Sequence, residues 1–345
     1  MPRIKNIKAV NWFCRQWVER PLFSTGLALA VMIILQTLAL GFNYSTFGEW
    51  WGSFCVNWIN VLRNNATVGI VALGMAYVII SGGIDLAVGS TLTMTGALFL
   101  LLADHSSAGW LNAAGLSGGW AFAVAFILVI FAGMALGEFN GVLIAQGSLP
   151  PFIATLGTMK MFRSLTQYFM QGRTPVLPDE FLEFSSLSWG KFMLMPIIYW
   201  LVTAAILHFI FKRTLFGSHV VAVGSNEKAA KLAGINVRAV KRRVYILSGA
   251  LVAFASVIQV CRIGSMDYSN AGSGYEMDAI AAVIVGGTRM NGGRGSIIGT
   301  VLGVLIIGVM NNLLNLLGVP PFLREAFKGL IVIVAVLLQK KEATS

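Results

Sequence analysis

The sequence predicts an all-α integral membrane protein with about ten transmembrane helices. Hydrophobic residues make up 57% of the 345 residues and charged residues only 11%, whereas soluble proteins carry roughly 25% charged residues. The charged residues also cluster in short segments between long apolar runs, as in loops between membrane spans. The net charge of +11 therefore does not indicate a nucleic-acid partner, and the expected surroundings are a lipid bilayer.

The chain begins with a basic tail, 1–20, which holds five Lys or Arg and one acid. The apolar run Leu22 to Gly41 has 20 residues, enough to cross a bilayer and longer than the apolar region of a signal peptide. We therefore expect an uncleaved first span and a transmembrane domain over 21–345. The next segment, Asn43 to Asn65, mixes aromatic and polar residues and predicts an interfacial helix or turn outside the membrane.

Nine further apolar stretches complete the predicted set of ten spans, and one of them, 277–288, is short enough to be a half-helix. They lie near 66–84, 88–104, 119–137, 150–170, 193–211, 244–263, 277–288, 294–316 and 322–338. With the N-terminus in the cytoplasm, 17 of the 25 Lys and Arg fall in cytoplasmic segments, five in outer segments and three within spans. The positive-inside rule therefore predicts that both termini are cytoplasmic.

A polar segment, Lys212 to Arg243, stands out among the apolar runs, with eight basic residues and a single acid, Glu227. Short polar side chains at Ser225 and Asn226 suit a helix start, and a glycine at Gly234 suits a helix end. The pattern predicts a two-turn helix over 225–234. A helix this short is unstable alone, so we expect it to dock on another surface.

The segment Ala222 to Asn236 resembles the coupling segment of ribose- and galactose-type ABC importer permeases. Ile80 to Ser90 and Tyr275 to Thr288 resemble two other signatures of that family, in the family's order, and the resemblance covers about 60–338. It implies a short cytoplasmic coupling helix that fits a separate ATP-binding-cassette ATPase subunit. The residues thereby assigned to coupling are Ser225, Asn226, Glu227, Lys228, Ala229, Ala230, Lys231, Leu232, Gly234 and Asn236.

The same resemblance implies a bacterial inner-membrane complex with a second permease chain, identical or paralogous, and an extracytoplasmic sugar-binding protein. The permease would translocate the sugar while ATP is hydrolysed on the ATPase subunit. This chain has no G-x₄-G-K-[ST] phosphate loop and no hydrolase motif, so we expect neither enzyme activity nor a cofactor of its own. The Cys and His residues show no metal-ligand spacing, and no metal site is predicted.

An internal echo indicates two related halves. Gly137-Glu-Phe-Asn140 precedes Pro150-Pro151-Phe152, and Gly308-Val-Met-Asn311 precedes Pro320-Pro321-Phe322. The first set is predicted at the inner side and the second at the outer side, which is the parity of an inverted-repeat permease. A rival echo, 78–90 with 283–296, lacks that parity, and we interpret it as similar loop chemistry.

Asp85 is the sharpest single candidate for the substrate path, because a charge at membrane depth is costly and usually functional. It either caps the following helix or belongs to a broken helix that lines the path. Amides suit sugar hydroxyls because they both donate and accept, although bonding between helices explains them equally well. The path candidates are Asp85, Glu138, Asn140, Asn311, Asn312 and Asn315. Glycines expected to allow close packing or tight turns are Gly82, Gly83, Gly89, Gly137, Gly295 and Gly299.

Two other classes remain open from the residues alone. One is an ion-coupled secondary transporter that acts by itself through Asp85 or Glu138. The small number of ionisable residues inside the spans and the basic coupling helix argue against it. The other is a membrane scaffold or receptor without transport, for which the polar residues in mid-span would be surplus.

Overall fold

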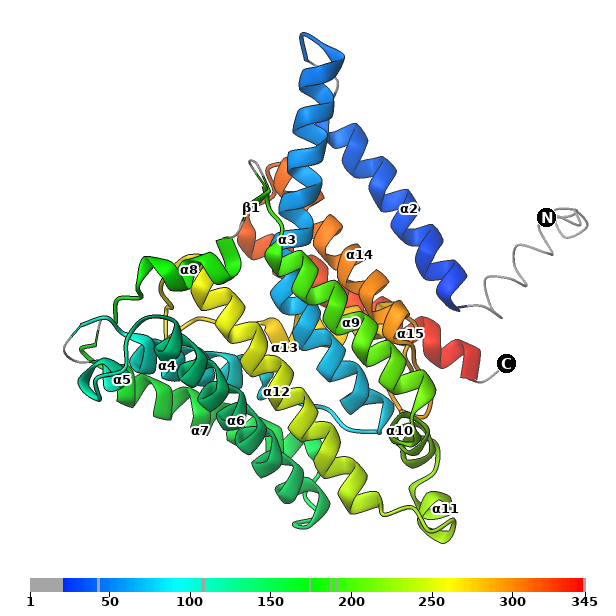
Figure 1. Ribbon diagram of the computed structural model, residues 1–345. Helices are drawn as coiled ribbons and strands as arrows, with labels where there is room; N and C mark the ends of the chain where they lie inside the picture. The colour runs from blue at the N-terminus through cyan, green and yellow to red at the C-terminus, as the bar shows by residue number, and fades with distance from the viewer. Residues whose placement is uncertain are drawn as a thin grey trace, which may run out of the picture.

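The computed structural model describes residues 21–41, 44–106, 109–173, 175–186, 188–189 and 192–343, and the predicted basic tail 1–20 lies outside them. The described chain is a bundle of helices with one two-stranded antiparallel ribbon (Figure 1). Its elements are α2 (Pro21–Leu40), α3 (Phe47–Ile80), α4 (Val88–Ala103), α5 (Trp110–Ala113), α6 (Gly118–Ala145), α7 (Pro151–Met170), α8 (Asp179–Ser186), β1 (Ser188–Trp189), β2 (Phe192–Met193), α9 (Met195–Arg213), α10 (Leu215–Ser225), α11 (Glu227–Leu232), α12 (Val237–Ile263), α13 (Tyr275–Val285), α14 (Ile297–Leu316) and α15 (Pro321–Ala343).

Within the described residues, six helices are long and apolar enough to cross a membrane: α2, α3, α6, α9, α12 and α14. They confirm an all-helical, multi-pass membrane protein. The other four predicted spans also fall on helices. Two of these, α4 and α13, are short, whereas α7 and α15 carry more polar and charged residues.

The segment Asn43 to Asn65, predicted as an interfacial helix or turn, is helical over most of its length, and this helix is longer than predicted. Most of this segment is the first part of α3, a continuous helix of 34 residues whose first turn is capped by the Thr46 hydroxyl. Within it, the Asn57 Oδ1 atom accepts hydrogen bonds from Gln36 of α2 (2.6 Å) and Asn312 of α14 (3.0 Å). These bonds connect α3 to two neighbouring helices.

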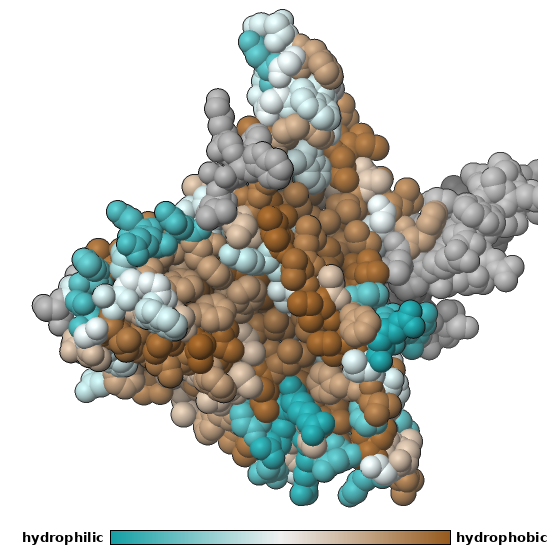
Figure 2. All heavy atoms as spheres, in the orientation of Figure 1, coloured by the Kyte–Doolittle hydropathy of each residue, from teal (hydrophilic) through white to brown (hydrophobic). Residues whose placement is uncertain are grey.

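The polar segment 212–243 is also more helical than predicted. α9 continues to Arg213, and α12 begins at Val237 rather than near residue 244. The basic residues at the start of α12 thus extend a spanning helix. Figure 2 shows hydrophilic side chains gathered at this end of the molecule, next to a broad apolar band over the middle of the bundle.

Close backbone contacts hold the centre of the bundle together. α12 lies at the centre and packs along α6 (Figure 1). At this contact a methyl group on Gly133 would lie 2.5 Å from the Gly249 oxygen, and Gly137 lies directly against the Tyr245 carbonyl. On the other side of the bundle, Gly299 of α14 meets the backbone of α13. In a bilayer such contacts allow dispersion forces to hold helices together.

In two places, consecutive helices are joined by an irregular connection. α3 and α4 are joined by an irregular connection at 81–87, and α12 and α13 by one at 264–274. The two connections are linked where Gly89, at the start of α4, meets Gly272. A side chain on either glycine would collide with the carbonyl oxygen of the other.

Candidate functional site

The short helix α11 begins and ends as its sequence dictates. The side-chain oxygen of Asn226 accepts a hydrogen bond from the Ala229 N–H (3.0 Å), which satisfies a donor that the first turn leaves free. Gly234 adopts φ +82°, the left-handed conformation that glycine tolerates best. The helix covers only Glu227–Leu232, so it is shorter than predicted, and Ser225 closes α10 instead.

α11 presents two different faces. The Ala230 side chain is 4% exposed and anchors the helix, whereas Leu232 is 90% exposed. A single exposed apolar side chain is common on protein surfaces and does not by itself mark a binding site. Lys228 is exposed as well, and nothing in the described chain covers it or Leu232.

The end of α10 connects this helix to the bundle through a backbone contact that we call the glycine junction. It consists of Gly82, Gly224, Gly292 and Gly293. Gly224 lies against the carbonyl of Ile80 and the nitrogen of Gly293, and a methyl group on Gly292 would lie 2.9 Å from the Gly82 nitrogen. The Gly293 N–H donates to the Ile80 carbonyl (2.9 Å). Backbone contacts therefore connect the end of α10, next to α11, to the end of α3 and to the connection between α13 and α14.

Asp85 lies in the connection 81–87, shortly after Gly82 of the glycine junction. Its side chain is 4% exposed, and its Oδ1 atom accepts from the Ala87 N–H (2.9 Å), just ahead of α4. The Tyr245 hydroxyl of α12 donates to the Ile84 carbonyl (3.0 Å) and leaves room beside it only for a glycine at position 83. The carboxylate is thus held in a turn before a helix, in an irregular connection between two spans.

The other candidates from the first half lie on α6, at the end near α11. Glu138 forms an ion pair with Arg242 of α12, whose Nε atom donates to it at 2.6 Å. Asn140 is 1% exposed, and its buried side-chain oxygen has no hydrogen-bond partner among the described residues. Glu138 thus fastens α6 to α12, whereas Asn140 keeps an acceptor available.

Asn311, Asn312 and Asn315 lie together at the opposite end, near the end of α14. Asn312 donates to Asn57, Asn315 is exposed, and the buried side-chain oxygen of Asn311 has no partner in the part of the chain that the structure describes. The structure therefore does not gather the six path candidates into one site. It places three of them near each end of the bundle.

Comparison with known proteins agrees with this architecture. A family described as the permease component of branched-chain amino acid transport systems matches residues 57–336. The chain belongs to this family.

The similarity extends to named relatives. The ribose import permease protein of Bacillus subtilis (strain 168) is 41% identical over 290 residues, 84% of this chain and 86% of the relative. That of Escherichia coli (strain K12) is 35% identical over 345 residues, 98% of this chain and 99% of the relative. A galactofuranose transporter permease protein of E. coli is 32% identical over 287 residues, 83% and 80% of the two chains. No solved structure matches. The chain is a permease subunit of the ribose- and galactose-type ABC importers, as its motifs predicted.

The sequence analysis of this permease missed the partners of two partly buried cations. The Arg163 guanidinium of α7 donates to the Thr93 hydroxyl (3.0 Å) and to the Ala271 carbonyl (2.7 Å), which ties the connection 264–274 to α4 and α7. Lys328 of α15 pairs with Asp278 of α13 at 2.9 Å, and both side chains are only 14% exposed. The signal was available, because a lone Lys or Arg inside an apolar stretch needs a partner.

The connection 264–274 of the permease also contains an acid with a shifted pKa. Asp267 accepts hydrogen bonds from the Asn270 side chain (3.0 Å) and from the backbone N–H of Ser269 (2.9 Å). These bonds lower the pKa of the Asp267 carboxyl because they stabilise its charged form, and the bond from the Asn270 side chain has the largest effect. Among the described residues, no group of three or more His, Cys, Asp or Glu is arranged to hold a metal ion.

Proposed function

We propose that this permease imports a sugar, delivered by an extracytoplasmic binding protein, and that α11 transmits ATP-driven movement of an ATPase subunit to the bundle. The observation that carries the proposal is the exposed, doubly capped α11, joined through the glycine junction to α3 and to the connection between α13 and α14. Relatives named as ribose import and galactofuranose transporter permeases support a sugar as the substrate. We assign coupling to Ser225–Leu232, Gly234 and Asn236.

The finer architecture belongs to the same proposal. The helices that overlap the ten predicted segments form ten spans, with both termini and α11 on the cytoplasmic side. The order α3–α4–α6–α7 repeats as α12–α13–α14–α15, and the two irregular connections begin at opposite ends of the bundle. The repeated Pro-Pro-Phe sequences fall at the starts of α7 and α15. This arrangement supports an inverted repeat.

The transport path is proposed to use groups from both halves. The buried side-chain oxygens of Asn140 and Asn311, which have no partner within the described residues, suit transient hydrogen bonds to sugar hydroxyls. Asp85 stands between the glycine junction and α4, so a change in the junction alters its surroundings. A second permease chain is proposed to complete the path. The alternative, a secondary transporter, would couple the ion through Asp85 or Glu138. Glu138 is less suited to that role because it is already paired with Arg242.

Crosslinking tests the proposal. A single cysteine replaces Lys228 in a chain whose native cysteines are serine, in membranes that contain the ATPase subunit and the second permease chain, with sugar uptake measured in parallel. We expect an ATP-sensitive crosslink to the ATPase, and none from a matched cysteine at the buried position Ala230. Uptake that persists without the ATPase and stops when the ion gradient collapses would instead establish a secondary transporter.

A further inference from the structure

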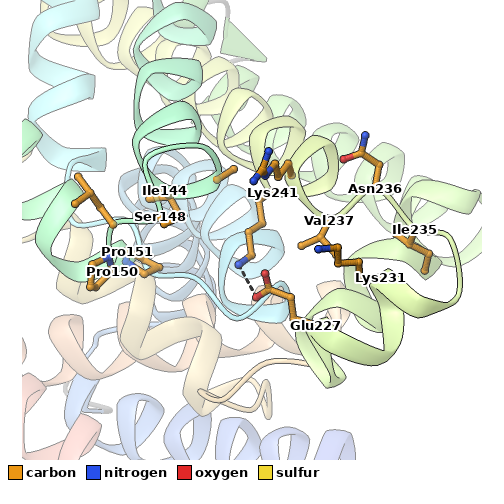
Figure 3. A pocket seen from close by; sticks show the side chains of 13 residues that line it. Ile144, Ser148, Pro150, Pro151, Glu227, Lys231, Ile235, Asn236, Val237 and Lys241 are labelled. Atoms are coloured by element: carbon orange, nitrogen blue, oxygen red, sulfur yellow. Dashed lines mark hydrogen bonds and ion pairs between the residues drawn. The ribbon is translucent and has the colours of Figure 1, made fainter.

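A groove of about 810 Å³ lies behind α11, between that helix, the start of α12 and the turn from α6 to α7. Figure 3 shows Glu227, Lys231 and Lys241 on one side of it and Ser148, Pro150 and Pro151 on the other. We call it the inner groove. Lys228 and Leu232, on the exposed face of α11, are not among its lining residues, whereas Glu227, Lys231 and Asn236, which are also assigned to coupling, are.

The inner groove carries an excess of positive charge. Lys231, Arg238 and Lys241 line it, and Glu227 is the single acid among the lining residues. Glu227 is already paired with Lys241 at 2.7 Å. Neither Lys231 nor Arg238 has an ion-pair partner among the residues that the structure describes, and both are exposed. Two cations therefore face the groove uncompensated.

Backbone dipoles add to the same field. α7, with 20 residues, and α12, with 27, both begin at the groove, where Pro150, Pro151 and Val237 line its wall. The N-terminus of a long helix carries a partial positive charge. The Asn236 side chain uses its oxygen to cap α12, which leaves its NH₂ group as a donor. An anion is thus attracted by two side-chain cations and two helix ends at once.

The walls of the groove are apolar and continue onto an apolar surface. Ile144 and Leu149 line it beside the two prolines. The next residues of α7, Phe152 and Ile153, are 55% and 59% exposed, as expected for side chains that face lipid. A soluble phosphate ion gains nothing from contact with an apolar surface, whereas the acyl chains of a lipid pack favourably against it.

We propose that the inner groove binds the phosphate headgroup of an anionic phospholipid, with its acyl chains along the exposed start of α7. Basic pockets between spanning helices at the cytoplasmic surface favour such headgroups. The proposal rests on the groove and on the cytoplasmic orientation of α11 proposed above, and it goes beyond the transport function. Bound lipid would brace α11 against the turn between α6 and α7.

The test uses the full-length chain, purified and placed in nanodiscs of phosphatidylcholine that contain a small fraction of phosphatidylglycerol. Retained lipid is counted by native mass spectrometry. Each of the two cations should contribute to lipid binding as a Lys or Arg near an anionic membrane surface does. The double variant K231Q/R238Q should therefore weaken retention of phosphatidylglycerol on the order of 25-fold. The matched control K228Q, which removes a charge from the same helix outside the groove, should change retention less than twofold.

Three outcomes would overturn the proposal. Equal loss in K228Q would mean a diffuse positive field rather than a site. Full displacement of the lipid by millimolar inorganic phosphate would mean a soluble-anion site. Loss of the lipid when the ATPase subunit is added would mean that an acidic segment of that protein is the true occupant. K231R with R238K keeps both charges and should retain the lipid, which separates loss of charge from misfolding.

Discussion

A methyl group at Gly224 is the sharpest test of how α11 connects to the bundle. In G224A the new Cβ would lie 2.6 Å from the Gly293 nitrogen and closer still to the Ile80 carbonyl oxygen. Both neighbours are backbone atoms, so neither can rotate away as a side chain could. Because α10 must shift, the hydrogen bond from Gly293 to Ile80 is also weakened.

The expected magnitude follows from three opposing terms. Alanine in place of glycine stabilises a helix by about 1 kcal/mol, whereas overpacking costs about 1–3 kcal/mol and the weakened hydrogen bond about 1 kcal/mol. The free energy of unfolding should therefore fall by about 1–3 kcal/mol. Since the clash lies between α11 and the spans, uptake per ATP hydrolysed should fall even when the ATPase still binds.

The assay compares G224A with G157A, which adds the same methyl group to α7 where nothing lies within 4 Å. Unfolding in mixed micelles gives the stability, and proteoliposomes with the complete complex give uptake and ATP hydrolysis. If G224A matched G157A in stability and in sugar moved per ATP, the glycine junction would not transmit movement.

Three further predictions concern the cap of α11, the ion pair between Lys328 and Asp278, and the Asp267 carboxyl. N226A removes the cap of α11 and should destabilise that helix by about 1 kcal/mol, seen as faster hydrogen exchange of its first amides. K328M leaves the buried Asp278 unpaired and should lower the free energy of unfolding by about 3 kcal/mol, largely restored by D278N. The Asp267 carboxyl, whose folded pKa is lowered, stabilises the protein above its unfolded pKa, and this contribution is lost as pH falls through the lowered folded value.

Each of these has its own refuting result. Unchanged exchange in N226A would mean that α11 is held by Ala230 alone. A K328M chain as stable as the parent would place Asp278 in water rather than in the bundle. D267N should lose the contribution of Asp267 to the acid dependence of unfolding, and an identical pH profile for D267N and the parent would mean that Asp267 makes no such contribution.

The membrane class, the ten helical segments and the two ends of α11 were accessible from the sequence. These features depend on local chemistry. Apolar run length decides which segments enter lipid, a short polar side chain caps a helix start, and glycine accepts the positive φ at its end. Asn226 and Gly234 therefore act as predicted.

The tertiary structure alone decided which distant groups meet. Asn57 stays inside a long α3 because Gln36 and Asn312 satisfy it, and Lys328 is stabilised because Asp278 faces it from another helix. No local rule specifies such pairs, since each depends on how helices far apart in the chain are packed. The inner groove has the same origin, because its cations and its apolar walls come from segments about 80 residues apart that only folding brings together.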